Sequence, residues 1–355
     1  MKTVIVGGVA GGATAAARLR RLDERMEIVL IERGAYISFA NCGLPYYVGG
    51  DIPDREDLLL QTPEDFYARY RVDVRVLEEA VDIDPKAKTL RIRRLRDGSE
   101  YTERYDKLLL SPGARPNVPP IPGAQAQNVF TLRTVPDALA IREYVIEKGC
   151  RSAAVIGGGF IGLEMAENLA RLGLEVTIIE AASQIAPSLD EDVACEAASY
   201  LRSLGVKIFT SAAVEDIGAL GADVVILSVG IRPESELAAR AGLKLTDRGL
   251  ILTDEAMRTS DPDIYAAGDA VAVRHAVSGA LTHIPLAGPA NKQARVAADN
   301  ICGIPSRYKG ALGTSVLKLF DMTVAATGLT ERALKGTGIP YDKVFLWSTS
   351  HAGYY

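Results

Sequence analysis

The run Val155-Ile156-Gly157-Gly158-Gly159-Phe160-Ile161-Gly162 places a complete GxGxxG motif directly after an aliphatic segment. Residues 163–172 have the pattern of a helix, and the next aliphatic segment, 176–179, ends on Glu180. A strand, a glycine turn, a helix and a later acid are typical of a dinucleotide-binding unit, in which the helix N-terminus receives the pyrophosphate and the acid binds ribose hydroxyls. The run therefore predicts an α/β fold built on a parallel sheet.

The same order of features opens the chain. Residues 2–6 predict a buried strand, Gly7-Gly8-Val9-Ala10-Gly11-Gly12 predicts the turn, and residues 13–22 predict the helix. The next predicted strand, 28–31, ends on Glu32. Val9 stands where the second glycine of the motif belongs, so this motif alone would be weak evidence.

Each half also closes in the same way, with a predicted strand that runs into Gly-x-Arg-Pro. The two copies are Gly113-Ala114-Arg115-Pro116 and Gly230-Ile231-Arg232-Pro233, and the proline-rich residues 116–122 are the expected joint between the halves. This duplication predicts two Rossmann-like domains in one chain, with two nucleotides meeting between them.

Composition limits the other possibilities. A chain of 355 residues is too long for one ordinary core. Its 48% apolar and 24% charged residues are typical of a soluble globular protein, and its net charge of −5 argues against nucleic acid as a partner. The aliphatic start is too short for a signal peptide or a membrane span. The four cysteines and three histidines are scattered without metal-ligand spacing, so we expect a reduced, cytoplasmic protein with no metal site.

The cysteine segment Ser38-Phe39-Ala40-Asn41-Cys42-Gly43-Leu44-Pro45-Tyr46-Tyr47 lies in a stretch, 34–50, that has no charged side chain. Pro45 favours a helix that begins here, and a helix N-terminus stabilises a thiolate. The alternative is a buried structural cysteine. Cys150, Cys195 and Cys302 lie beside no glycine motif, so we assign them to packing.

Outside the two halves the pattern is less regular. Between residues 50 and 105 it predicts a helix over 63–70 and strands over 72–76 and 89–94. A strand ends in Gly268-Asp269, where the acid either binds a sugar hydroxyl or makes an ordinary turn, and a helix over about 285–301 follows. The last 42 residues, 314–355, predict strands over 314–319, 323–328 and 344–348 and a helix over 330–335, too little to close a core.

Segments 8–12, 38–47, 157–164, 265–269 and 285–291 resemble the FAD-dependent pyridine nucleotide–disulfide oxidoreductases, specifically the single-cysteine branch that includes the coenzyme A disulfide reductases. The resemblance covers the whole chain. It implies an FAD-binding domain from residues 1–118 and 239–313, an NAD(P)H-binding domain from 119–238, and the start of an α+β dimerisation domain in 314–355. In the family that last domain continues further, and some relatives carry a fused sulfurtransferase domain, so we expect a C-terminally truncated form of a homodimer.

The resemblance also implies the site residues. FAD contacts are expected in the first glycine loop, the cysteine segment, two strand ends and the start of a late helix: Gly7, Gly8, Val9, Ala10, Gly11, Glu32, Arg33, Ser38, Asn41, Cys42, Ser111, Gly113, Gly268, Asp269, Pro285, Leu286 and Ala287. NAD(P)H contacts are expected at Gly157, Gly159, Phe160, Ile161, Glu164, Glu180 and Gly230. Candidate coenzyme A contacts are Thr14, Arg18, Arg21, Ser38 and Asn41.

Several of these roles have a plainer alternative. Phe160 either covers the flavin until nicotinamide displaces it or packs within its turn, and Glu164 either faces the flavin–nicotinamide contact or caps its helix. Arg18 and Arg21 either bind the phosphates of coenzyme A or form a solvated helix face. Glu180, with no basic residue before Arg202, favours NADH, although NADPH stays possible.

The expected mechanism passes hydride from NAD(P)H through FAD to Cys42, held as a mixed disulfide with coenzyme A. No second thiol lies within 43–47, so the partner sulfur must come from outside. Tyr354 and Tyr355, with His351, resemble a family segment that reaches the partner subunit's site, where tyrosine helps to protonate the leaving thiolate; the alternative is a fraying chain end.

Three other functions stay open. The first is an NADH peroxidase or oxidase that cycles Cys42 through sulfenic acid, although those relatives place a histidine where Val9 and Ala10 stand. The second is polysulfide or persulfide reduction by the same cysteine. The third, from another class, is an electron-transfer flavoprotein reductase or a redox-sensing module with Cys42 idle.

Overall fold

A computed structural model describes residues 1–349, 353 and 354 of the chain. One five-stranded sheet has the order β15-β7-β1-β2-β3, and all four of its strand pairs are parallel. Its strands are β1 (Lys2–Val6), β2 (Glu27–Glu32), β3 (Asp73–Val76), β7 (Lys107–Leu110) and β15 (Ile264–Ala266). The last of these comes from far along the chain, so residues on both sides of the second half contribute to this sheet.

The second sheet repeats the first. Its order is β12-β11-β10-β13-β9, again with parallel pairs throughout. Its strands are β9 (Val129–Phe130), β10 (Ser152–Ile156), β11 (Glu175–Ile179), β12 (Lys207–Phe209) and β13 (Val224–Leu227). In both sheets the strand before the glycine turn is central, as expected for doubly wound units. The predicted α/β class with two Rossmann-like sheets is confirmed.

The helices after the glycine turns are α1 (Ala10–Leu22) and α5 (Phe160–Arg171). Each begins three residues before its predicted start at 13 or 163, because the helix takes in the last residues of the glycine motif itself. The other helices are α2 (Leu44–Gly49), α3 (Pro63–Tyr70), α4 (Val135–Lys148), α6 (Glu191–Ser203), α7 (Glu236–Arg240), α8 (Ala287–Ile301) and α9 (Glu331–Lys335). α8 packs along α1 on the first sheet.

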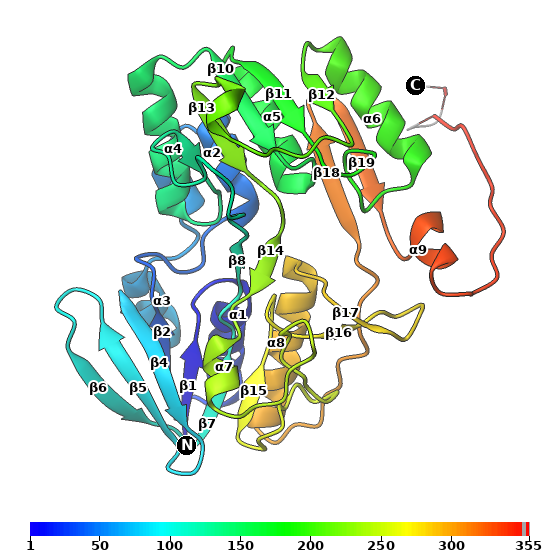
Figure 1. Cartoon of the computed structure of the whole chain (residues 1–355). Coiled ribbons are helices and arrows are strands. Elements are labelled where there is room, and N and C mark those ends of the chain that lie inside the picture. Colours follow the sequence, from blue (N-terminus) through cyan, green and yellow to red (C-terminus); the bar gives the residue numbers. More distant parts are fainter. Residues whose placement is uncertain (350–352, 355) are drawn as a thin grey trace.

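The two Gly-x-Arg-Pro copies pair with each other. β8 (Ala114–Pro116) and β14 (Ile231–Pro233) form an antiparallel ribbon in which Arg115 lies opposite Arg232. Figure 1 shows this ribbon between the two halves, so the chain crosses to the second half and returns at one place. The sequence predicted the duplication but not this pairing.

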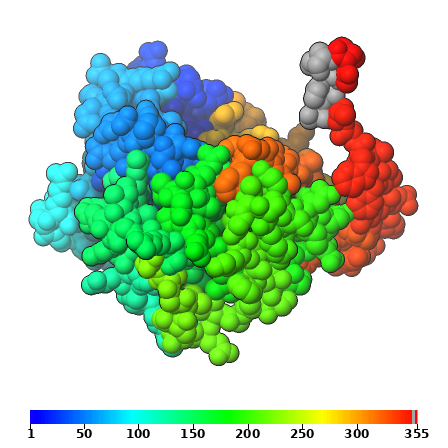
Figure 2. Space-filling model, turned by 90° about the horizontal axis from the view of Figure 1, so that it is seen from above, coloured from blue at the N-terminus to red at the C-terminus, as the bar shows by residue number. Residues whose placement is uncertain are grey.

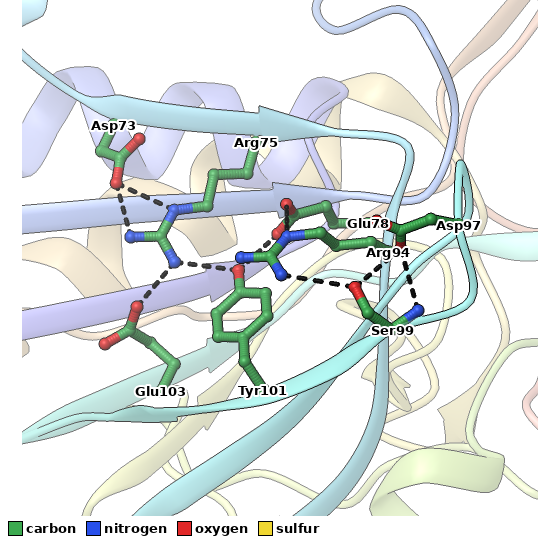
Figure 3. A network of polar contacts seen from close by, with 8 residues as sticks. All are labelled: Asp73, Arg75, Glu78, Arg94, Asp97, Ser99, Tyr101 and Glu103. Carbon is green, nitrogen blue, oxygen red and sulfur yellow. Dashed lines mark hydrogen bonds and ion pairs between the residues drawn. The ribbon is translucent and has the colours of Figure 1, made fainter.

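A three-stranded antiparallel sheet lies beside the first parallel sheet and consists of β4 (Glu78–Asp84), β5 (Thr89–Arg94) and β6 (Glu100–Arg104). The sequence predicted β5 and missed β4 and β6, because these two are rich in charged residues and lack an apolar alternation. Ion pairs hold this region: Arg75 pairs with Glu103 and Asp73, and its guanidinium also reaches the Tyr101 hydroxyl, which bonds Glu78 (Figure 3).

Two short hairpins complete the described elements, β16 (Val273–Arg274) with β17 (Leu281–Thr282) and β18 (Ser315–Leu319) with β19 (Met322–Ala326). The predicted strand over 344–348 is wrong, since these residues form no regular element and the side chains of Val344, Leu346 and Trp347 are exposed. A strand needs a neighbouring backbone to pair with, and no described strand lies against this segment.

The cysteine segment belongs to the core of the second half. Leu44, Tyr47 and Val48 of α2 lie in one apolar cluster with Leu163 and Leu169 of α5 and with residues of α4. Figure 1 shows α2 beside α4 and α5, although its sequence position is in the first half. Figure 2 views this face, where the β18–β19 hairpin, in orange, adjoins the green second half. The turn before α2 therefore sits where both halves meet.

Candidate active site

The first glycine loop is a close backbone contact. Gly7 has φ +96°, and a Cβ on Gly12 would lie 1.7 Å from the carbonyl oxygen of Gly7. A Cβ on Gly11 would lie 2.3 Å from the hydroxyl oxygen of Ser111. The carboxylate of Glu32 accepts hydrogen bonds of 2.7 Å from the backbone N–H groups of Gly8 and Gly34. These residues thus form a cradle with an acid at its rim, as a dinucleotide requires.

The second loop has the same construction. Gly157 has φ +103°, and a Cβ on Gly162 would lie 2.1 Å from its carbonyl oxygen. Glu180 accepts hydrogen bonds from the N–H groups of Gly158, at 2.6 Å, and Ala182, at 2.7 Å. Gly159 lies at the N-cap of α5 with nothing within 4 Å of an added Cβ, which matches the place of Val9 before α1. The two loops therefore fit the same part of two ligands.

A cavity of about 350 Å³ lies at the carboxyl ends of β1 and β2, where doubly wound sheets bind nucleotides. It is lined from the first half and from residues that follow the β14 strand: Val6, Gly7, Ile31, Glu32, Arg33, Glu78, Glu79, Ala80, Pro112, Arg115, Glu234, Glu236, Leu237 and Arg240. Arg33 and Arg115 pair with Glu234 at 2.6 and 3.5 Å. Figure 3 shows Glu78, a wall residue, held by Arg94 and Tyr101. Its place makes this cavity a candidate site for one of the two nucleotides.

The Gly-Asp strand end is held by side chains from distant segments. Gly268 has φ +90°, and its N–H donates to the buried Gln293 side chain at 2.8 Å. Asp269 forms an ion pair with Arg133 at 2.9 Å, and a ring nitrogen of His283 lies 2.7 Å from its carbonyl oxygen. Sequence reasoning missed Arg133 and His283, because neither stands in a motif; only proximity in the folded chain reveals them.

The remaining predicted contacts of the two nucleotides fall at turns and helix starts. Leu286 is the N-cap of α8, so Pro285 and Ala287 flank a helix N-terminus. Gly113 and Gly230 have φ +77° and +92° just before the paired ribbon. Phe160 is half-buried against the core of the second half, whereas Ile161 is exposed at the start of α5. These residues thus lie at turns and helix starts, and their roles stay predictions.

The candidate coenzyme A residues divide into two groups. On α1, the Thr14 hydroxyl donates to the Asn291 side chain at 2.6 Å and Arg18 pairs with Asp299 at 2.8 Å, both partners being on α8, while Arg21 is exposed. Beside the cysteine, Ser38 has φ +45°, a strained value for a residue with a side chain. The Asn41 side-chain oxygen is buried and has no hydrogen-bond partner among the described residues. This orphaned acceptor is a place where a ligand could donate.

Cys42 itself is exposed, in a single 3₁₀ turn (Asn41–Gly43) that leads into α2. The reading of a buried structural cysteine is therefore wrong. Partial desolvation of the sulfur, with the carboxylate of Glu164, raises the pKa of the Cys42 thiol. Both effects oppose the thiolate, and its stabilisation by the helix N-terminus and the flavin stays a prediction.

Glu164 lies one turn into α5, and its carboxyl group is the most perturbed acid near the cysteine. Burial, with the neighbouring Glu167, raises the pKa of Glu164 from 4.5 to about 7. Glu167 is fully buried and pairs with Arg171 at 3.2 Å and Lys318 at 3.8 Å. The Glu164 carboxyl group therefore loses its proton near neutral pH, and its negative charge then opposes ionisation of the Cys42 thiol.

Replacing Glu164 with glutamine should stabilise the protein in alkaline more than in acidic buffer. The native state keeps this proton between pH 4.5 and about 7 while the unfolded chain releases it, so the free energy of unfolding falls as pH rises through that interval. The variant removes this loss and should gain about 1–2 kcal/mol at pH 8 relative to pH 5. Urea unfolding of both proteins at the two pH values measures it; an equal difference at both would contradict the prediction.

The other predicted thiols and tyrosines have mixed outcomes. Cys150 and Cys302 are half-buried against the two main cores, as packing requires, but Cys195 is exposed on α6, so its packing assignment is wrong. Tyr354 is exposed. Tyr355 and His351 lie outside the described residues. The catalytic role of the tyrosines stays a prediction.

Within the described part of the chain, no cluster of three or more His, Cys, Asp or Glu side chains could hold a metal ion. None of its helices is both long and apolar enough to cross a membrane.

Residues 1–294 match the family model described as pyridine nucleotide-disulphide oxidoreductase. Among curated proteins, an NADH oxidase of Methanocaldococcus jannaschii is 37% identical over 93% of this chain and 76% of its own length. The NAD(P)H coenzyme A polysulfide/persulfide reductase of Pyrococcus horikoshii is 36% identical (100% and 81%), and the coenzyme A disulfide reductase of Staphylococcus haemolyticus is 34% identical (100% and 82%).

Among solved structures, reduced Bacillus anthracis CoADR-RHD is 50% identical with a TM-score of 0.98. All of this chain is covered in that comparison, and 66% of the solved chain. The chain thus spans just under two thirds of that solved protein and about four fifths of the curated relatives.

Proposed function

The chain belongs to the pyridine nucleotide–disulfide oxidoreductase family, and from this premise we propose that it is an FAD-dependent NAD(P)H oxidoreductase that reduces coenzyme A disulfide through Cys42. The observation that carries the proposal is the place of the sulfur. Cys42 is exposed in an uncharged turn, and the helix that follows it packs on α5, which begins in the second dinucleotide loop.

Each loop has a ligand that suits it. The first loop, its cavity and Asp269 would hold FAD, and the second loop with Glu180 would hold NAD(P)H. Bound FAD supplies a two-electron relay between the nicotinamide and a disulfide of Cys42. Glu180 is itself an anion beside the loop, so it disfavours a ribose 2′-phosphate, and we propose NADH as the preferred donor.

The chemistry of the chain's own residues is thiol–disulfide exchange. The Cys42 thiolate attacks one sulfur of coenzyme A disulfide, a Cys42–coenzyme A disulfide forms, and the other coenzyme A leaves as a thiolate that takes up a proton. Two electrons then break the mixed disulfide, which restores the Cys42 thiolate and releases the second coenzyme A. Each turnover therefore consumes one NADH and one proton and yields two thiols.

Thr14, Arg18, Arg21, Ser38 and Asn41 are the proposed coenzyme A contacts. Arg18 would have to exchange its ion pair with Asp299 for a phosphate, a change that is inexpensive because the arginine is about one third exposed. A homodimer through the C-terminal region, protonation by Tyr354 or Tyr355 and a cytoplasmic location are further parts of this proposal.

A second candidate is reduction of a persulfide or polysulfide, because the same exposed sulfur can attack any sulfur–sulfur bond. The oxidase activity named for the Methanocaldococcus relative is a third, with Cys42 cycling through sulfenic acid. The chain has Val9 and Ala10 in the first loop where peroxidase-type relatives would place a histidine.

Anaerobic titration of the FAD-loaded protein with NADH separates the three candidate functions. It is made before and after addition of one oxidant at a time: coenzyme A disulfide, a polysulfide, and oxygen or peroxide. Mass spectrometry of the Cys42 peptide should find an adduct of coenzyme A mass after coenzyme A disulfide is added, which is lost on reduction. A persulfide formed in preference to that adduct would support the second candidate. A sulfenate formed only with oxygen or peroxide would support the third.

A further inference from the structure

Arg142 connects the second half of the chain to the cysteine helix. It lies on α4, and one of its terminal nitrogens donates to the backbone carbonyl oxygens of Tyr47 at 3.1 Å, Ile52 at 3.5 Å and Pro53 at 3.1 Å. Its guanidinium also stacks over the Tyr47 ring, 4.6 Å from the centroid. One side chain therefore holds both the end of α2 and the loop that follows it.

These acceptors are at the end of α2 that a cation stabilises. α2 has only six residues and closes on Gly50, at φ +86°, so its last carbonyl groups have few partners within the helix. Charge-assisted hydrogen bonds to such carbonyls are stronger than neutral ones, and a positive charge there complements the helix dipole. A helix this short is not stable in isolation, so its position depends on its apolar packing against α4 and α5 together with contacts at its ends.

Two other contacts hold residues 49–51: an ion pair and a close van der Waals approach. Arg171 of α5 pairs with Asp51 at 2.8 Å, but both side chains are about a third exposed, and such pairs contribute little. A Cβ on Gly49 would lie 2.2 Å from the Asn168 side-chain oxygen, so α2 and α5 are already in close contact. Arg142 thus adds a charged contact at the carboxyl end of α2 to the apolar packing that holds the helix.

We propose that Arg142 is a positioning residue for Cys42. Its hydrogen bonds from α4 hold the carboxyl end of α2, and this sets the position of the sulfur in the turn that precedes α2. The proposal rests on the proposed function for its effect on turnover. It requires that loss of Arg142 changes the behaviour of Cys42 and leaves hydride uptake from NADH unchanged.

The variants are Arg142→Met, which keeps the length of the aliphatic stem, Arg142→Lys, which keeps the charge, and Asp51→Asn, which removes only the exposed ion pair on the same segment. Each FAD-loaded protein is assayed for coenzyme A disulfide turnover, for NADH-dependent ferricyanide reduction, and for the rate of Cys42 alkylation by iodoacetamide across pH. The Arg142 variants leave unchanged the groups that act on Cys42, Glu164 and Tyr46, and the charged side chains around those two: Asp51, Glu167, Arg171 and Lys318.

Arg142→Met should lower disulfide turnover by about tenfold or more and raise the pH midpoint of alkylation by about half a unit, while ferricyanide reduction stays within about twofold. Arg142→Lys should recover part of both losses, because its ammonium keeps the charge and can donate, but the side chain is shorter and lacks the planar group that stacks over the Tyr47 ring. Asp51→Asn should match the parent.

Two results would overturn the proposal. One is an Arg142→Met protein whose alkylation profile and turnover equal those of Asp51→Asn. The other is a loss of ferricyanide reduction by the same factor as disulfide turnover, which would indicate general destabilisation. If the parent protein does not reduce coenzyme A disulfide, the proposed function fails, but the alkylation midpoint still decides the role of Arg142.

Discussion

Substitution of Cys42 by serine should lower coenzyme A disulfide turnover by about a thousandfold or more, because serine cannot form the mixed disulfide. NADH-dependent reduction of ferricyanide should stay within about twofold of the parent, because it needs the two nucleotide sites and no thiol. Steady-state assays of the two reactions on the same FAD-loaded preparation measure this. The contrast between the reactions, rather than either rate alone, is the test.

The matched control is Cys195→Ser. Cys195 is exposed, as Cys42 is, but lies on α6 away from both glycine loops. This variant should keep both activities, which excludes a contribution from any accessible thiol. Full disulfide turnover by the Cys42→Ser protein would instead assign the chain to the electron carriers, with Cys42 idle.

Substitution of Gly162 by alanine should raise the KM for NADH by about a hundredfold or more while the protein keeps its FAD. The added carbon would lie 2.1 Å from the carbonyl oxygen of Gly157, so the start of α5 must move away from the loop that receives the pyrophosphate. The first loop is untouched, so flavin absorbance should persist. Ferricyanide reduction as a function of NADH concentration gives the KM.

Gly159→Ala is the comparison within the same motif. An added carbon there meets nothing within 4 Å, and the first loop already carries Val9 at the matching place. Its KM for NADH should rise less, by about tenfold at most, because the added carbon would crowd only the bound pyrophosphate and leaves α5 in place. If both substitutions raised the KM for NADH equally, contact between α5 and the carbonyl group of Gly157 would not explain the effect of Gly162→Ala.

The glycine loops could be predicted from sequence because their geometry is local. The close approach of Gly12 to Gly7, and of Gly162 to Gly157, involves residues five apart. The acids Glu32 and Glu180 follow Gly8 and Gly158 after 24 and 22 positions. The fold class followed from the repetition of that local pattern. The turn at Cys42 was visible for a similar reason, since a proline and a lack of charge mark it.

Contacts between distant segments left no such signal. Arg133 meets Asp269 across 136 positions, and Arg142 meets Tyr47 across 95, so no window of sequence contains either pair. The strand predicted over 344–348 failed in the opposite way. Its run of apolar side chains is local, but strand formation depends on a neighbour that the described residues do not provide.

The shared apolar cluster of α2 and α5 has a consequence for the order in which the nascent chain folds. Synthesis proceeds from the N-terminus, so the early strands can assemble while the later ones are still to be translated. Leu44, Tyr47 and Val48 complete their packing only after Leu163 and Leu169 of α5 have been made. A half-translated chain therefore has one nucleotide loop, but Cys42 does not yet have its final position. That position is reached only when both nucleotide loops have been made.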